Sequence, residues 1–261
     1  SPIIGRAVFK ALIVVAYPPG KGRRYEVFLV HVTAHDIDHH NAKRVFRRLS
    51  KEILGFDCSY RTVAAYVSLR EKELMPKNNE GYDINVDVLI NNAGFGDSGS
   101  FADSDWQKQY EMVQLNVIAL MQLTHCFINT MLEQGHGKIL NMSSVAAFSA
   151  GPNMSIYYAT KEFVRSFSEA VSEEVKGTGV TVTAFCPGPT ATGFEQAASM
   201  DKGSTMFRKA AKAEDVAKGG IHAMMRGKAL SYYGGYTKCM SFMCRIVPRS
   251  VAREYAARMN Q

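Results

Sequence analysis

The sequence predicts a doubly wound α/β fold, in which helices cover both faces of a parallel sheet of about seven strands. Short apolar runs rich in β-branched residues, typical of buried strands, alternate with longer stretches that have the apolar spacing of helices. The strand-like runs lie at residues 10–16, 25–32, 61–69, 86–94, 138–142 and 180–186. The 261 residues contain no internal repeat and no linker, so we expect one domain over residues 1–261.

The composition is that of a globular protein, with 46% apolar and 21% charged residues. No apolar run reaches the 18 or so residues that a membrane span needs, and no N-terminal signal pattern is present. The five cysteines are odd in number and form no Cys-x-x-Cys pair. We therefore expect no disulfide framework and a cytoplasmic location.

The net charge of +7 allows three interpretations. A nucleic-acid partner is one, but the basic residues are dispersed along the chain rather than arranged in a stripe. The densest patches are residues 21–24 and 43–48. An anionic dinucleotide or a solvated basic face explains them more simply, so we expect no nucleic-acid partner.

Tyr157 and Lys161 form the pattern with the clearest chemistry. They are four residues apart in a helical stretch, so they share one helix face. A phenol has a pKa near 10, and a neighbouring ammonium lowers it toward useful proton transfer. This spacing occurs about once by chance in a chain of this length, so it needs supporting residues. Ser144, thirteen residues upstream at the end of a strand, offers a second hydroxyl.

Three further motifs accompany this pair. Asn91-Asn92-Ala93-Gly94 follows the run 86–90, Asn116 lies at mid-helix beside an apolar stripe, and Pro187-Gly188-Pro189-Thr190-Ala191-Thr192 follows the run 180–186. Together with Ser144, Tyr157 and Lys161, these motifs resemble the short-chain dehydrogenase/reductase family. The resemblance is specific over residues 86–192 and looser toward the C-terminus. It implies a Rossmann-like three-layer fold.

The resemblance also implies an oxidoreductase that moves a hydride between NADP(H) or NAD(H) and a carbonyl or secondary alcohol. Tyr157 would exchange the proton, Lys161 would lower the Tyr157 pKa, and Ser144 would bind the substrate oxygen. Asn116 would sit at a helix break and link Lys161 to solvent through a water chain. The implied cofactor-binding residues are Gly20, Gly22, Asn91, Ala93, Gly94, Tyr157, Lys161, Pro187, Gly188, Thr190 and Thr192.

The N-terminal third departs from the family pattern. A Tyr-Pro-Pro-Gly-Lys-Gly segment, residues 17–22, replaces Thr-Gly-x-x-x-Gly-x-Gly, and about nine residues separate the first two runs. A parallel crossover needs a dozen or more, so the first helix is expected to be deleted or reduced to a turn. Tyr66 stands where the family has an adenine-contacting Asp. We expect weak cofactor binding, with NADP(H) slightly favoured by nearby basic residues; the alternative is a non-catalytic binding or scaffold protein.

A histidine cluster in the N-terminal third of the chain suggests a metal site as one hypothesis. Its members are His31, His35, His39 and His40. The segment is loop-like and has no second ligand set, so we expect no metal site.

The C-terminal region is predicted to shape the substrate side. Residues 193–247 are expected to form a substrate lid or a subunit interface, beginning with a mobile flap over 193–213. The aromatic and Met-rich stretch 230–247 has two open readings, as core or as lid and interface. The interpretation as lid and interface implies an apolar substrate, and the resemblance implies a homodimer or homotetramer.

Residues 105–134 are predicted to form a long helix, closed by Gly135, whose buried stripe comprises Val113, Val117, Leu120, Thr124, Ile128 and Met131.

Overall fold

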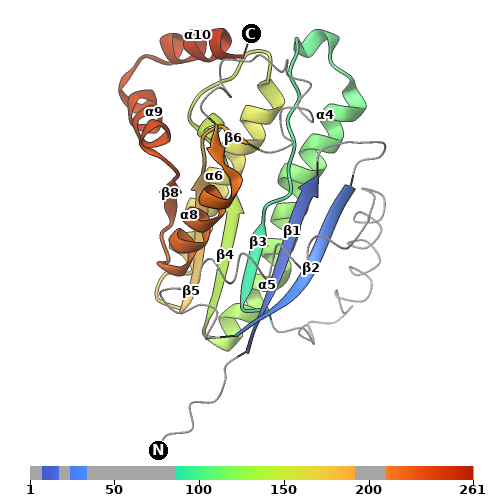
Figure 1. Ribbon diagram of the computed structural model, residues 1–261, viewed down its shortest axis with the longest axis vertical. Helices are drawn as coiled ribbons and strands as arrows, with labels where there is room; N and C mark the ends of the chain where they lie inside the picture. Colours follow the sequence, from blue (N-terminus) through green and yellow to red (C-terminus); the bar gives the residue numbers. More distant parts are fainter. Residues whose placement is uncertain (1–7, 18–23, 34–85, 192–209, 261) are drawn as a thin grey trace, which may run out of the picture.

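The computed structural model describes residues 8–17, 24–33, 86–191 and 210–260, which form a six-stranded sheet with helices on both faces (Figure 1). The strand order is β2-β1-β3-β4-β5-β8. The strands are β1 (Val8–Tyr17), β2 (Arg24–Thr33), β3 (Val88–Asn91), β4 (Gly137–Met142), β5 (Val180–Cys186) and β8 (Leu230–Tyr232). Two short strands, β6 (Thr190–Ala191) and β7 (Ala211–Lys212), pair in parallel apart from the main sheet. The prediction of a doubly wound, three-layer fold is confirmed.

The first two strands form an antiparallel pair at one edge of the sheet. Their register runs from Val8 opposite Thr33 to Tyr17 opposite Arg24, whereas β1 pairs in parallel with β3. Only residues 18–23 separate β1 from β2, and an antiparallel pair needs no crossover helix. The expected loss of the first helix is therefore confirmed. Without this helix, β2 runs antiparallel to β1.

Several predicted features lie outside the described residues. They are the strand over 61–69, Tyr66, most of the flap over 193–213, and three of the clustered histidines, His35, His39 and His40. Among the residues that the structure describes, no group of three or more His, Cys, Asp or Glu side chains could hold a metal ion.

Alternate residues of the central strands face opposite layers. Leu89, Ile139 and Val182 pack with Phe127 and Met131 of α5 (Leu120–Gln134). On the other face, the core of Val88, Leu140 and Phe185 includes Val216, Ala223 and Met224 of α8 (Ala213–Met225). A parallel sheet covered on both faces needs apolar side chains at both alternations, which is why these strands read as continuous apolar runs.

The predicted long helix is present, but it is interrupted. It consists of α4 (Trp106–Val113), a π-helical segment η2 (Gln114–Ala119) and α5. Asp105 caps its start by accepting a hydrogen bond from the Gln107 N–H at 2.9 Å, and Gly135 ends it with φ of 72°.

The π-helical segment shifts the buried stripe of this helix. The main buried positions are Met112, Leu115, Asn116, Leu120, Thr124, Phe127 and Met131. The prediction was right at Leu120, Thr124 and Met131, and wrong at Val113, Val117 and Ile128, which are half-buried. A π turn holds one extra residue, so Val113, which precedes it, is displaced by one from a regular 3.6-residue pattern.

Residues Trp106–Gln134 also have the length and the mean hydropathy of 1.3 that would allow a bilayer crossing. Within the described ranges this is the one helix with those properties. Its buried positions pack against the sheet, as the core helix of a folded domain does, and this packing accounts for the apolar composition.

The C-terminal segment covers the carboxyl edge of the sheet. The long helix α6 (Ser155–Glu174) starts at this edge, and the 3-10 turn η3 (Val145–Phe148) precedes it. A second 3-10 turn, η1 (Phe101–Asp103), lies before α4. Helices α9 (Gly235–Ile246) and α10 (Arg249–Met259) lie at the upper left in Figure 1. Tyr158 Oη donates to Asn260 Oδ1 at 3.1 Å, and Asn260 Nδ2 donates to the Pro152 carbonyl at 2.9 Å. The predicted 230–247 stretch thus divides into sheet strand β8 and surface helix α9.

Candidate active site

The predicted site motifs meet at one edge of the sheet, where β3, β4 and β5 end. Ligands of doubly wound folds bind at this edge. The loop after β4 is held against β5 and its continuation: the Ser143 N–H donates to the Phe185 carbonyl, and the Val145 N–H to the Pro187 carbonyl, both at 2.8 Å. Parallel strands therefore bring together motifs that lie up to about a hundred residues apart in the sequence.

Tyr157 lies in the first turn of α6 with its side chain 9% exposed. Burial raises the pKa of Tyr157 to about 12, and a hydrogen bond with Ser144 lowers it by less than burial raises it. The resemblance implied a lowered pKa, and the structure gives the opposite direction because desolvation of the phenolate is the largest effect. Tyr157 is therefore a protonated phenol, bonded to Ser144, across the physiological pH range.

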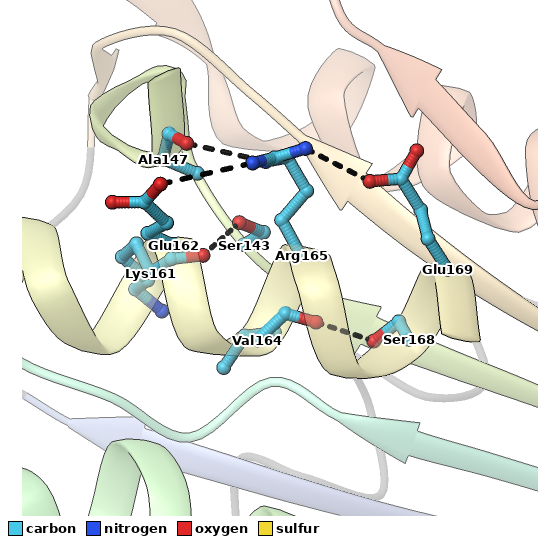
Figure 2. Close-up of polar contacts among 8 residues, drawn as sticks. All are labelled: Ser143, Ala147, Lys161, Glu162, Val164, Arg165, Ser168 and Glu169. Carbon is cyan, nitrogen blue, oxygen red and sulfur yellow. Dashed lines mark hydrogen bonds and ion pairs between the residues drawn. The ribbon is translucent and has the colours of Figure 1, made fainter. Parts of the chain in front are cut away.

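Lys161 lies one turn after Tyr157 on the same helix face, as predicted. Its Nζ is 5.8 Å from the centroid of the Tyr157 ring and donates to the Met142 carbonyl at 2.9 Å. Burial lowers the pKa of Lys161 to about 8. The Lys161 carbonyl accepts from Ser143 Oγ at 2.8 Å, which fixes this turn of α6 to the end of β4 (Figure 2).

Asn116 lies in the π-helical segment, so the helix break implied by the resemblance is confirmed. Its Oδ1 accepts from the Phe95 N–H at 3.1 Å, and its Nδ2 donates to the Phe95 carbonyl at 2.9 Å and to Thr160 Oγ1 at 3.1 Å. Asn116 therefore binds the loop after β3 to the helix that carries Tyr157. Thr160, which sequence reasoning missed, connects Asn116 to Tyr157, because its Oγ1 also donates to the Tyr157 carbonyl at 2.7 Å.

Gly94 lies between Asn116 and Lys161. A Cβ atom at position 94 would be 2.9 Å from Asn116 Oδ1 and 3.2 Å from Lys161 Nζ. Gly188 is similarly constrained, because a Cβ there would be 2.9 Å from Thr237 Oγ1 of α9. At both positions the absence of a side chain allows the main chain to pack directly against neighbouring side chains.

The side chain of Asn91 belongs to the core and not to the site surface. Its Nδ2 donates to Thr124 Oγ1 at 3.2 Å and to Asn141 Oδ1 at 2.8 Å, and Asn141 Nδ2 donates to Ser168 Oγ at 2.9 Å. This buried chain of polar groups joins α5, β3, β4 and α6. Sequence reasoning missed it, although a polar Asn141 within the apolar run 138–142 was a signal. Any contact of residue 91 with a cofactor would come from its main chain.

The remaining predicted cofactor residues divide into two groups. Pro187 and Gly188 follow β5 directly, and Thr190 Oγ1 donates to the Gly188 carbonyl at 3.0 Å, so this loop lies at the same edge as Tyr157. Ala93 is next to Gly94 after β3. Gly20, Gly22 and Thr192 lie outside the described residues.

Arg165 supports the site from one turn after Lys161, and sequence reasoning missed it. Its Nε donates to the Ala147 carbonyl at 3.2 Å, its Nη1 to Glu169 Oε2 at 2.9 Å, and its guanidinium lies 5.2 Å from the Phe148 ring centroid. Figure 2 shows Arg165 reaching from α6 to η3. This contact fixes the turn that begins at Ser144.

An apolar cavity of about 340 Å³ lies between η3, α6 and the two C-terminal helices. Val145 and Ala146, which follow Ser144, and Tyr158, which follows Tyr157, form one side. Met240, Met243 and Val247 form part of the other side. The cavity wall is thus one residue away, in sequence, from each of the two hydroxyl groups.

A sequence profile described as "short chain dehydrogenase" matches residues 30–203, which is more than half of the chain. The chain belongs to the short-chain dehydrogenase family. The edge where the parallel strands end, with Ser144, Tyr157 and Lys161, is therefore the candidate active site of this family member.

Individual relatives match over part of their length. The ketoacyl reductase HetN of Nostoc sp. is 36% identical over 103 residues, 40% of this chain and 36% of that protein. The uncharacterized oxidoreductase YvrD of Bacillus subtilis is 36% identical over 124 residues, 44% of this chain and 47% of that protein. The chain thus spans less than half the length of these curated relatives.

Solved structures show the same fold. A short-chain dehydrogenase from Sphingobium yanoikuyae in complex with NADPH is 26% identical with a TM-score of 0.56, covering 65% of this chain and 63% of that one. The family assignment and this likeness support a nicotinamide-dependent oxidoreductase.

Proposed function

We propose that the chain transfers a hydride between a nicotinamide cofactor and the carbonyl or secondary alcohol of an apolar molecule, with Tyr157 exchanging the proton. The observation that carries this proposal is the meeting of Ser144, Tyr157 and Lys161 at the carboxyl edge of the sheet. The residues that follow Ser144 and Tyr157 in the sequence line an apolar cavity. Family membership supports the reaction class.

The residues at this edge fit the nicotinamide end of such a cofactor. Gly94 follows β3 and packs against Lys161, and Gly188 follows β5 and accepts a hydrogen bond from Thr190, so both glycines lie where ligands of doubly wound folds bind. When bound, the cofactor supplies or accepts the hydride. We propose NADP(H) as slightly favoured, supported by the NADPH complex of the Sphingobium relative and by Lys21, Arg23 and Arg24 in this chain.

The protein groups handle the proton and the developing charge. Ser144 and Tyr157 share a hydrogen bond, so both hydroxyls can converge on one substrate oxygen. During reduction, the protonated Tyr157 donates its proton to the oxygen as negative charge develops there. The Lys161 ammonium stabilises the tyrosinate that remains, across the 5.8 Å to the ring. Asn116 holds the loop of Gly94 in place, and its water-chain role remains a prediction.

The cavity supports an apolar substrate. Its volume of about 340 Å³ lies at the lower end of the range for small-molecule sites. Its lining combines aliphatic, methionine and tyrosine side chains, and the hydroxyls of Tyr236 and Tyr255 hydrogen-bond to each other within it. An apolar chain attached to the reacting carbonyl would fill such a space.

Replacing Tyr157 with Phe tests the assignment. The change removes one hydroxyl, and we expect turnover of bulky ketones to fall by about 10²- to 10⁴-fold, the usual contribution of general acid catalysis. Cofactor absorbance measures the rate. Tyr110→Phe, which removes the hydroxyl of an exposed tyrosine on α4, is the matched control and should keep full activity. Wild-type turnover in folded Tyr157→Phe would refute the proposal.

A second candidate, a non-catalytic relative with impaired cofactor binding, is favoured by one observation. The antiparallel pairing of β1 and β2 removes the crossover helix whose N-terminus would receive a pyrophosphate. Such a helix end contributes roughly 0.3 to 1 kcal/mol to an exposed anion and up to about 2 kcal/mol when partly buried. We expect weak but measurable binding in calorimetric titrations with NADP(H) and NAD(H). No binding at millimolar concentrations would favour the non-catalytic reading.

Location and assembly are also proposals. The described cysteines, Cys126, Cys186, Cys239 and Cys244, are all free, which suits a reducing cytoplasm. A homodimer or homotetramer is supported by exposed apolar groups on α4 and α6, where Trp106 is 69% exposed and Phe163 stacks on Phe167 at 5.7 Å. Light scattering at several protein concentrations would test this assembly.

A further inference from the structure

Helix α9 is apolar on its exposed face and polar on its buried face. Phe242 and Ile246 are 59% and 64% exposed, whereas Thr237 and Ser241 are 1% and 3% exposed. At 3.6 residues per turn, these two pairs lie on opposite sides of the helix. A surface helix of a globular protein normally buries its apolar side. This arrangement leaves large apolar side chains on the outer side of α9 exposed.

The apolar surface extends beyond these two residues, and we refer to it as the α9–α10 face. It comprises Tyr236, Phe242, Met243, Ile246, Val251 and Tyr255, each exposed by 43% or more. Four of them also line the apolar cavity: Tyr236, Met243, Val251 and Tyr255. The α9–α10 face is therefore continuous with the wall of the cavity.

Positive charges accompany the α9–α10 face. Lys238, Arg245, Arg249 and Arg253 are exposed on the same two helices and have no ion pair within the part of the chain that the structure describes. The one acidic residue of these helices, Glu254, is paired with Arg258 at 2.7 Å. The two helices that carry the exposed apolar groups thus also carry four cations that have no ion pair with the described residues.

We propose that the α9–α10 face docks on the surface of an anionic lipid bilayer. Aromatic and aliphatic side chains enter the boundary between headgroups and acyl chains, and flanking Lys and Arg side chains contact lipid phosphates. A second copy of this chain fits less well, because a two-fold contact would bring two sets of four like charges together. An anionic bilayer supplies both the apolar environment and the opposite charge.

Docking places the cavity beside the acyl chains of the bilayer, since the face and the cavity share side chains. The substrate would then be a lipid-like molecule that carries the reacting carbonyl or alcohol on an apolar chain. This second step rests on the proposed function, whereas docking itself does not.

Vesicle co-sedimentation tests docking without any activity measurement. The protein should sediment with vesicles of phosphatidylcholine and phosphatidylserine and less with phosphatidylcholine alone, and salt should weaken the binding. Arg245→Gln/Arg249→Gln should lower affinity for the anionic vesicles about thirtyfold, at about fivefold for each cation. Phe242→Gln/Ile246→Gln should lower affinity for them at least about tenfold.

Two matched pairs serve as controls. Arg226→Gln/Lys228→Gln removes the same charge just before β8, at the opposite edge of the sheet. Phe101→Gln/Leu132→Gln removes two other exposed apolar groups, at 57% and 36% exposure. Both pairs should bind vesicles like the wild type. All the replaced side chains are exposed, so the variants should fold, and circular dichroism melting curves would verify this.

Three results would overturn the proposal. They are the absence of wild-type binding to the anionic vesicles, an equal loss of binding in the control pairs, and a smaller particle size of Phe242→Gln/Ile246→Gln in light scattering. The last result would assign the α9–α10 face to a second copy of the chain. Because the readout is sedimentation, failure of docking leaves the hydride-transfer proposal intact, and inactivity toward ketones leaves docking intact.

Discussion

Gly94 approaches Asn116 so closely that a Cβ atom at position 94 would lie 2.9 Å from its Oδ1. Asn116 cannot move away freely, because its amide makes three hydrogen bonds, two to Phe95 and one to Thr160. Lys161 Nζ would be 3.2 Å from the same Cβ. The loop after β3 and the helix of Tyr157 are therefore fitted to each other at a single glycine.

Gly94→Ala should displace Asn116 or Lys161. We expect turnover to fall about tenfold to a hundredfold, because small displacements at a reacting centre have effects of this size. The free energy of unfolding should fall by about 1 to 3 kcal/mol from overpacking. Gly235→Ala is the control: a Cβ there meets nothing within 4 Å, so both quantities should stay near wild type. Full activity of Gly94→Ala would contradict the close fit.

The buried polar chain through Asn141 predicts a stability effect far from the surface. Ser168→Ala removes the acceptor of the 2.9 Å hydrogen bond from Asn141 Nδ2 and leaves that donor buried and unpaired. We expect the free energy of unfolding to fall by about 1 to 3 kcal/mol in urea titrations. Ser166→Ala, at an exposed position of the same helix, should change it by less than about 0.5 kcal/mol. Equal effects of the two changes would show that the chain of polar groups adds no stability.

Lys161 predicts a pH-dependent stability. Burial lowers its pKa from 10.5 to about 8, so the unfolded chain holds this proton more tightly than the folded protein. The protonated amine therefore destabilises the fold below pH 8, and the penalty disappears as the pH rises from about 8 to 10.5. Relative to Lys161→Met, the wild type should gain about 3 kcal/mol of unfolding free energy over this interval. A constant difference between the two proteins would contradict a buried, depressed lysine.

The cavity predicts selectivity for substrate length. Met240 lines it, so Met240→Ala should lower kcat/KM for long-chain ketones by about tenfold while changing short ketones little. Phe242 belongs to the same aromatic and Met-rich stretch, 230–247, but it is 59% exposed and does not line the cavity. Met121→Ala, at an exposed position on α5, is the control. Equal losses for long and short ketones would mean that the cavity does not receive the substrate chain.

The sequence by itself determined the features that depend on neighbouring residues. Apolar runs located the central strands, the four-residue spacing placed Tyr157 and Lys161 on one helix face, and Gly135 marked a helix end. The short interval between the first two strand-like runs also excluded a crossover helix. These features follow from the geometry of helices, strands and turns, which the order of residues specifies directly.

The tertiary structure decided the features that depend on burial and on distant partners. It turned β2 antiparallel, committed Asn91 to the core, and raised the pKa of Tyr157 where Lys161 alone would have lowered it. It also exposed the apolar side of α9. Desolvation and long-range hydrogen bonds arise only when segments far apart in the chain meet, so residue spacing carries no record of them.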